Sequence, residues 1–130
     1  MTAGFRASPL PVSKTAGAVV TDKQNYACKL DTSGNVVPCT ATTDVVYGII
    51  QEYTGSGVTG DAVEVAPVNG GGSSNIYLSG TIATGSLVTI DANGAASADA
   101  ATNYNIGQLE AGGAVGELGV IRLGNITVKA

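Results

Sequence analysis

The sequence predicts an all-β fold, a small barrel or sandwich built from two related β repeats with an extended N-terminal arm. The first reason is repetition, because Leu-Asp-Thr-Ser-Gly at residues 30–34 returns as Ile-Asp-Ala-Asn-Gly at residues 90–94. The second is the glycine content of 19 in 130 residues, which indicates many turns and little helix. The third is a series of short apolar runs bounded by turn residues, a pattern that is typical of β-strands. A duplicated β unit in one short chain is typical of barrels and sandwiches.

Two further matches extend the repeat. Tyr-Gly-Ile-Ile at residues 47–50 returns as Ile-Gly-Gln-Leu at 106–109, and Gly-Asp-Ala-Val at 60–63 returns as Gly-Glu-Leu-Gly at 116–119. The spacing between copies shrinks along the chain, so loops differ in length between them. We therefore divide the chain into an arm and a single β domain. The predicted boundaries are residues 1–16 for the arm, 17–130 for the domain, about 17–68 for repeat one, 69–75 for a linker, about 76–123 for repeat two and 124–130 for a terminal strand.

Each repeat supplies its own strands. Those of repeat one are expected at residues 18–20, 26–30, 35–37, 45–53 and 62–66, and those of repeat two at 76–78, 87–90, 106–110, 118–123 and 126–128. Gly48 interrupts the longest run, where we expect a bulge or a close backbone contact. Residues 95–102 are rich in Ala and are compatible with one helical turn.

Two cysteines flank the first predicted turn. If Ser33 and Gly34 form a two-residue hairpin loop, Cys28 and Cys39 face each other across the hairpin. Opposed cysteines can approach disulfide distance, but geometry often prevents closure and a cytosol keeps thiols reduced. A disulfide and a pair of small buried thiols both remain open, and the second is favoured.

Charge is sparse and segregated. Charged residues make up 12% of the chain, about half the ~25% of an ordinary soluble domain. This favours an assembled working state in which much of the surface is covered. No Lys or Arg occurs between residues 30 and 121, where nine acids lie. Such an acidic body repels nucleic acid and anionic lipid, so neither is an expected partner.

The sequence contains no apolar run of the length of a signal peptide or of a membrane span. We therefore expect the protein to fold in a cytosol.

The residues for catalysis are scarce. There is no His, and two Cys cannot complete a tetrahedral zinc site alone, so we expect no enzyme, cofactor or metal site. Asp31 and Asp91 each precede a glycine turn, where Asp caps its own backbone. A calcium site remains a weaker alternative to a solvated acidic face for the acids at residues 52, 61, 64, 110 and 117.

The N-terminal residues lack periodicity and carry two prolines, which predicts an extended arm. An aromatic residue in such an arm favours a docking anchor over an idle residue. The adjoining basic residues suit either an acidic partner or simple solvation of the chain end. The arm is expected to be disordered in the free protein and ordered on its partner. The candidate docking residues are Phe5, Arg6, Pro9, Pro11 and Lys14.

The turn-centred pattern has a family resemblance. Residues 26–38, then Ala-Thr-Thr-Asp at 41–44 leading to Tyr-Gly-Ile at 47–49, resemble the capsid decoration, or cement, proteins of tailed bacteriophages. Residues 88–94 and 106–110 resemble the same pattern, so the likeness covers roughly residues 17–123. The cysteine pair and the arm depart from it.

This resemblance implies a small β-rich subunit, often trimeric, on the outside of an expanded phage head. The implied function is that of a structural virion protein that stabilises the capsid shell, assembled in the host cytoplasm. Its implied partners are the major capsid protein and further copies of itself. The alternative is a non-catalytic binding module of a phage tail fibre or adhesin that contacts host surface glycans. The absence of Trp weighs against that alternative.

Overall fold

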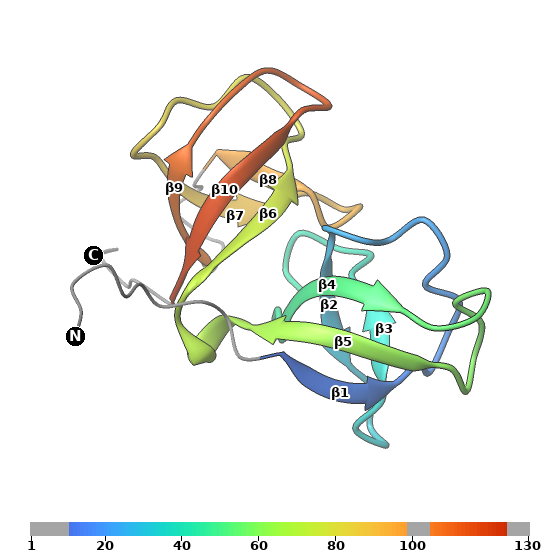
Figure 1. Cartoon of the computed structure of the whole chain (residues 1–130). Helices are drawn as coiled ribbons and strands as arrows, with labels where there is room; N and C mark the ends of the chain where they lie inside the picture. The colour runs from blue at the N-terminus through green and yellow to red at the C-terminus, as the bar shows by residue number, and fades with distance from the viewer. Residues whose placement is uncertain (1–10, 99–104, 125–130) are drawn as a thin grey trace.

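A computed structural model describes residues 11–98 and 105–124, and the architecture is all-β, as predicted. Two five-stranded antiparallel sheets pack against each other (Figure 1). The first contains β1 (Val12–Thr15), β2 (Ala27–Leu30), β3 (Val36–Pro38), β4 (Gly48–Tyr53) and β5 (Ala62–Pro67). The second contains β6 (Ser73–Tyr77), β7 (Leu87–Ile90), β8 (Ala96–Ala98), β9 (Gly107–Ala111) and β10 (Leu118–Leu123). A 3-10 turn, η1 (Val68–Gly70), joins them.

The two sheets have the same topology. Their strand orders are β1-β5-β4-β2-β3 and β6-β10-β9-β7-β8, so each strand of one has its counterpart in the other. Each sheet also closes on itself, because Ala16 forms a parallel bridge to Val36 and Leu78 forms one to Ala96. We call β1–β5 the first barrel and β6–β10 the second barrel. The repetition seen in the sequence is therefore a repetition of whole barrels.

The aliphatic-Gly pattern marks a close backbone contact in both barrels. A Cβ built on Gly48 would lie 2.3 Å from the Ala66 carbonyl oxygen, and one on Gly107 would lie 2.1 Å from that of Arg122. Both distances are far inside van der Waals contact, so only glycine fits. Of the two alternatives expected at Gly48, the close backbone contact is therefore confirmed, whereas the register shift of β4 lies further along the strand, between Ile50 and Glu52.

The barrel interiors are filled by compensating side chains. In the first barrel Ala16 and Val63 are both buried. The matching positions in the second barrel hold Leu78 and Gly119, and a Cβ on Gly119 would lie 3.0 Å from Leu78 Cδ2. A larger residue at one position is thus balanced by a smaller one at the other, which keeps each interior close-packed.

A shared apolar cluster joins the barrels. It contains most of the second barrel's interior together with Ala27, Cys39, Ile49 and Ala66 of the first barrel and Val68 of η1. Hydrogen bonds cross the same boundary: the Tyr77 N–H donates to the Asn25 carbonyl at 3.1 Å, and Gln51 Nε2 donates to Ser74 Oγ at 2.8 Å. A second cluster, around Val36 and Ile50, fills the first barrel alone.

Several predicted boundaries differ from the structure. Val12–Thr15 form β1 and pair with β5, so the sheet begins inside the segment expected to be an arm. Residues 18–20 are not a strand, whereas residues 96–98 of the Ala-rich segment form β8. The second repeat begins at Ser73, within the expected linker. The expected terminal strand lies outside the described residues apart from Gly124, which is not in a strand.

The predicted hairpin register is wrong by one residue. Leu30 pairs with Val36 and Cys28 with Pro38, so Cys28 does not face Cys39. The turn has a three-residue loop in which the Gly34 N–H donates to the Asp31 carbonyl and Gly34 adopts a φ of 80°. Both cysteines are buried free thiols, as the favoured interpretation predicted.

Candidate functional site

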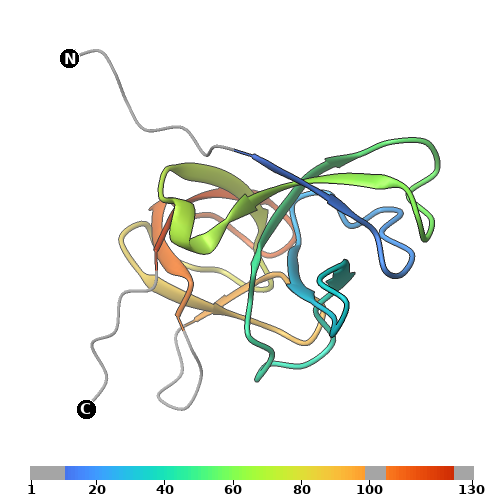
Figure 2. The same cartoon turned by 90° about the horizontal axis from the view of Figure 1, so that it is seen from below.

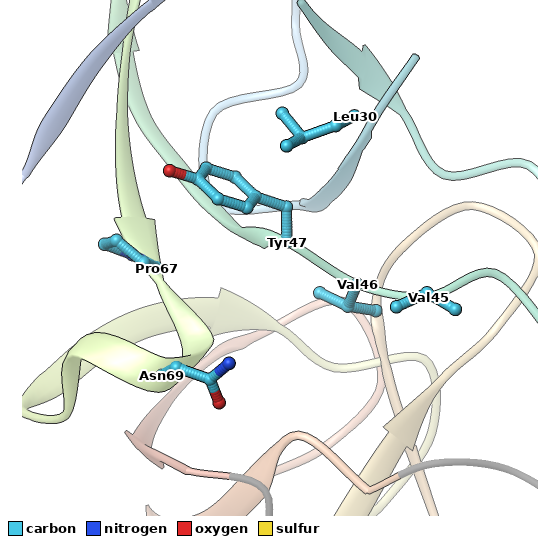
Figure 3. Close-up of a pocket in the computed structure, with 6 residues that line it drawn as sticks. All are labelled: Leu30, Val45, Val46, Tyr47, Pro67 and Asn69. Atoms are coloured by element: carbon cyan, nitrogen blue, oxygen red, sulfur yellow. The ribbon is translucent and has the colours of Figure 1, made fainter. Parts of the chain in front are cut away.

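A cavity of about 330 Å³ opens at the end of the first barrel nearest η1. Figure 3 shows Tyr47 near its centre, with Pro67 on one flank and Val45 and Val46 on the other. The wall is mostly apolar and comes from the ends of β2 and β5, the segment before β4, and η1. We call this cavity the first-barrel mouth, and its lining residues are Leu30, Val45, Val46, Tyr47, Pro67 and Asn69.

A basic side chain lies beside the mouth. Lys14 in β1 is half-buried, and its Nζ lies 5.5 Å from the centre of the Tyr47 ring, a cation–π arrangement. The strand registers match Lys14 to Ile76 and Tyr47 to Ile106 in the second barrel, where both positions are buried and apolar. The first barrel is thus the more polar and open of the two at this end.

The predicted docking residues fall into two groups. Lys14 is fixed in the sheet, and Pro11 is exposed at the start of the described chain, one residue before β1. Phe5, Arg6 and Pro9 lie outside the described residues. A docking role for these five residues stays a prediction, but Lys14 belongs to the barrel and would act from there.

A second hollow, of about 530 Å³, lies between the barrels. Tyr26 and Tyr77 stack in it with ring centroids 5.0 Å apart, and Lys23 Nζ lies 5.2 Å from the centre of the Tyr26 ring. These contacts occupy ring faces that a sugar would otherwise cover. The stacked rings therefore hold the two barrels together, and they leave little free aromatic surface for a sugar to stack on.

The acids before the glycine turns cap their own loops, as predicted. Asp31 Oδ1 accepts hydrogen bonds from the N–H groups of Ser33 and Asn35, both at 2.9 Å. Asp91 Oδ1 accepts the equivalent bonds from Asn93 and Ala95, at 2.8 and 2.9 Å. Both carboxylates thus stabilise loops.

Two of the candidate calcium ligands also serve loops. Asp61 Oδ2 accepts from the N–H groups of Gly57 and Val58, both at 3.1 Å, and Glu117 Oε1 accepts from that of Ala114 at 2.7 Å. Within residues 11–98 and 105–124, no group of three or more His, Cys, Asp or Glu side chains is placed to hold a metal ion.

The described part of the chain contains one ion pair. Lys29 Nζ lies 3.0 Å from Asp44 Oδ1, while Asp44 Oδ2 accepts from the N–H groups of Thr40 and Ala41. Desolvation opposes ionisation of Asp44, but the hydrogen bonds from Thr40, Lys29 and Ala41 outweigh it and lower its pKa. This pair anchors the loop before β4, which carries Val45 and Val46 into the mouth.

The surroundings of Cys28 and Cys39 suppress the reactivity of both thiols. Burial raises the pKa of Cys28, and burial together with the nearby Asp44 carboxylate raises the pKa of Cys39 to about 12. The thiolate is the reactive form of cysteine, so neither residue has the character of a nucleophile.

Comparison with protein-family models gives no match, and comparison with curated proteins gives none either. Among the described residues, no helix has the length and apolar character needed to cross a membrane.

Sequence reasoning missed the first-barrel mouth. A usable signal was present in the repeat, because Lys14 and Pro67 stand where the second copy has Ile76 and Leu123. The signal becomes visible only when β1 is aligned with β6, and an arm that ends at residue 16 contains all of β1.

Proposed function

We propose that this protein is a structural virion protein that binds the outside of a phage head and stabilises the expanded capsid shell. The observation that carries the proposal is that several of its carboxylates accept hydrogen bonds from loop N–H groups, so these side chains stabilise the scaffold. The carboxylates of Asp31, Asp91, Asp61 and Glu117 stabilise loops, and both thiols are buried. A duplicated scaffold of this kind is suited to adhesion.

The family resemblance of the turn motifs supports the same role, with the major capsid protein as partner. Exposed apolar side chains suit a protein that is covered in its working state. They are Val19, Leu30, Val45, Val58, Val115 and Leu118. Self-association, most simply as a trimer at a threefold position of the shell, is part of the proposal.

The mechanism would be burial of apolar surface at many equivalent shell positions. Each ~1,000 Å² of apolar surface removed from water contributes up to ~25 kcal/mol before the costs of association. Repetition over the shell multiplies a modest affinity at each site.

The test is binding to undecorated heads. Purified protein is added to heads that lack it, and occupancy is measured by sedimentation together with resistance of the heads to heat. We expect saturable binding and a higher temperature of head disruption. Binding to tails, or to host surface glycans with none to heads, would support the tail-fibre or adhesin alternative.

The role of the arm is tested by deleting residues 2–10, which leaves β1 intact. Phe5→Ala is the matched point variant, and both are compared with wild type at limiting protein and at several salt concentrations. We expect reduced occupancy for both variants. Salt should weaken the charged part of the interaction more than the apolar part. Occupancy equal to wild type would confine the contact to the barrels.

A further inference from the structure

The second barrel is filled at the end that corresponds to the first-barrel mouth. Val68, in η1, is buried in one cluster with Ile76, Ile106 and Leu123. The Leu123 N–H donates to the Gly72 carbonyl at 2.8 Å, which holds the segment after η1 along the end of β10. Figure 2 shows the 3-10 turn lying across the second barrel, directly before β6 begins. Apolar side chains and backbone together close this end.

Three differences between the repeats open the first barrel at the same end. The strand registers match Lys14 to Ile76, Tyr47 to Ile106, and Pro67 to Leu123. The three residues of the second barrel are buried, whereas those of the first barrel are only partly buried. The cavity of about 330 Å³ is therefore present where the other repeat has a packed apolar cluster.

Lys14 occupies an inward-facing position of its strand. Directly opposed residues of an antiparallel pair lie on the same face of the sheet. Lys14 is paired with Val63, which is buried in the interior of the first barrel. The side chain of Lys14 therefore leaves the strand on the interior face, and its Nζ ends 5.5 Å from the centre of the Tyr47 ring. A basic group is thus built into the wall of the barrel beside the mouth.

The positive charge of Lys14 is not matched by a carboxylate of the described residues, among which the one ion pair joins Lys29 to Asp44. The acids that adjoin the lining residues are already engaged. Asp31 accepts hydrogen bonds from loop N–H groups, and Asp44 is held by Lys29 and by two backbone N–H groups. An unmatched cation at the edge of an apolar cavity is complementary to a ligand with one negative charge and an apolar body.

The size and place of the mouth suit a small molecule. Ligand sites occur in the mouths of β-barrels, and they combine an apolar wall with a few polar groups. A cavity of ~150 Å³ is enough to hold benzene, so the mouth has room for one ring and a short chain. Figure 3 shows Asn69 at the edge opposite Leu30, where its side-chain amide can donate or accept a hydrogen bond.

We propose that the first-barrel mouth binds a small carboxylate with an aromatic or branched aliphatic body. The body lies against Leu30, Val46 and Tyr47, and the carboxylate pairs with Lys14. A compact ligand fits because the lining residues come from four segments that surround one hollow, the ends of β2 and β5, the segment before β4, and η1. The inference concerns the free protein and does not depend on the proposed function.

The experiment is an NMR titration of the full chain with 3-phenylpropionate as the probe. We expect saturable shifts of the methyl resonances of Leu30, Val45 and Val46. The methyl resonances of Val58 should stay in place, because this exposed valine lines neither described cavity. The uncharged analogue 3-phenylpropanamide, which has the same shape, should shift the same methyls and bind several-fold more weakly.

Lys14→Met tests the charge, since it removes the ammonium group and keeps an apolar stem. The variant should fold, because the second barrel has Ile76 at this position. Its affinity for the carboxylate should fall several-fold, to that for the amide, and its affinity for the amide should not change. The matched control is Lys23→Met. Lys23 Nζ also lies over a tyrosine ring, 5.2 Å from the centre of Tyr26, but it lines the hollow between the barrels.

Equal affinities for the acid and the amide, or a Lys14→Met variant that binds the acid like wild type, would overturn the proposal. Shifts that never saturate, or that extend to Val58, would show non-specific adsorption and overturn it as well. A capped phenylalanyl-aspartate dipeptide is titrated alongside the free acid. Shifts with the dipeptide and none with the free acid would assign the mouth to a protein partner and contradict a small-molecule site.

Discussion

The Ala27 N–H of β2 donates a hydrogen bond to the Gly94 carbonyl in the β7–β8 turn, with 2.9 Å between nitrogen and oxygen. A Cβ on Gly94 would lie 2.9 Å from the Ala27 carbonyl oxygen. The turn of the second barrel thus rests on the backbone of the first. The counterpart turn is free of such a contact, since nothing lies within 4 Å of a Cβ on Gly34.

Gly94→Ala should therefore destabilise the protein more than Gly34→Ala. Both glycines have positive φ, 85° and 80°, and an alanine there costs about 1–2 kcal/mol. Gly94→Ala must also displace the Ala27 backbone, which adds about 1–3 kcal/mol. Urea unfolding of both variants measures the difference. Equal losses would mean that the contact between the barrels contributes nothing.

Gly48→Ala and Gly107→Ala should each cost about 3 kcal/mol or more, because the new methyl meets a backbone carbonyl that cannot move without breaking the sheet. The matched control is Gly80→Ala. Gly80 has no positive φ and nothing within 4 Å of its Cβ position, so a change within about 0.5 kcal/mol is expected. Thermal and urea unfolding provide the measurement, and a mild effect at either strand glycine would refute the close approach.

Asp31→Ala and Asp91→Ala should each lower the free energy of unfolding by about 1–3 kcal/mol, since each removes two hydrogen bonds to a carboxylate. Asn at either position keeps an acceptor oxygen and should recover part of the loss. Amide hydrogen exchange at residues 33, 35, 93 and 95 locates the effect. Fast exchange at these amides in the wild type would show that the caps do not form.

The buried thiols predict a loss of stability at high pH. A thiol of the unfolded chain ionises near its ordinary pKa of 9.0, whereas burial keeps both thiols protonated to higher pH in the folded state. The unfolded state therefore releases protons first, and stability falls as pH rises above about 9. Each thiol contributes a slope of up to about 1.4 kcal/mol per pH unit.

The control for that prediction is the double variant Cys28→Ala, Cys39→Ala, which isolates the thiols from Tyr and Lys titration. Its unfolding free energy should fall less steeply between pH 9 and 11. The native wild type should also react with a thiol reagent only at the rate of unfolding. Rapid labelling of both cysteines at neutral pH would contradict their burial.

The sequence was sufficient for the fold class because its signals are local: a turn acid, a turn glycine and a strand glycine recur in both copies. It was insufficient where tertiary pairing decides. β1 has no periodicity of its own and forms because β5 offers an edge to Val12–Thr15. The predicted register of the hairpin is wrong because the sequence does not distinguish a two-residue loop from a three-residue loop. The observed loop has three residues and ends in Gly34, which has a positive φ.

The candidate site was only partly predictable for the same reason. The charge of Lys14 marks it as a candidate in the sequence, but its place beside Tyr47 follows from the pairing of β1 with β5. Leu30, Val45 and Pro67 come from three separate segments, and no local pattern marks them as one cavity.

The most direct test of the proposed function is an electron cryo-microscopy map of purified virions that carry the protein. The account predicts density for two five-stranded barrels side by side on the outer head surface, repeated at equivalent positions of the shell. Heads without the protein should lack that density and recover it when the protein is added. Density for the two barrels in the tail or its fibres, with none on the head, would contradict the account.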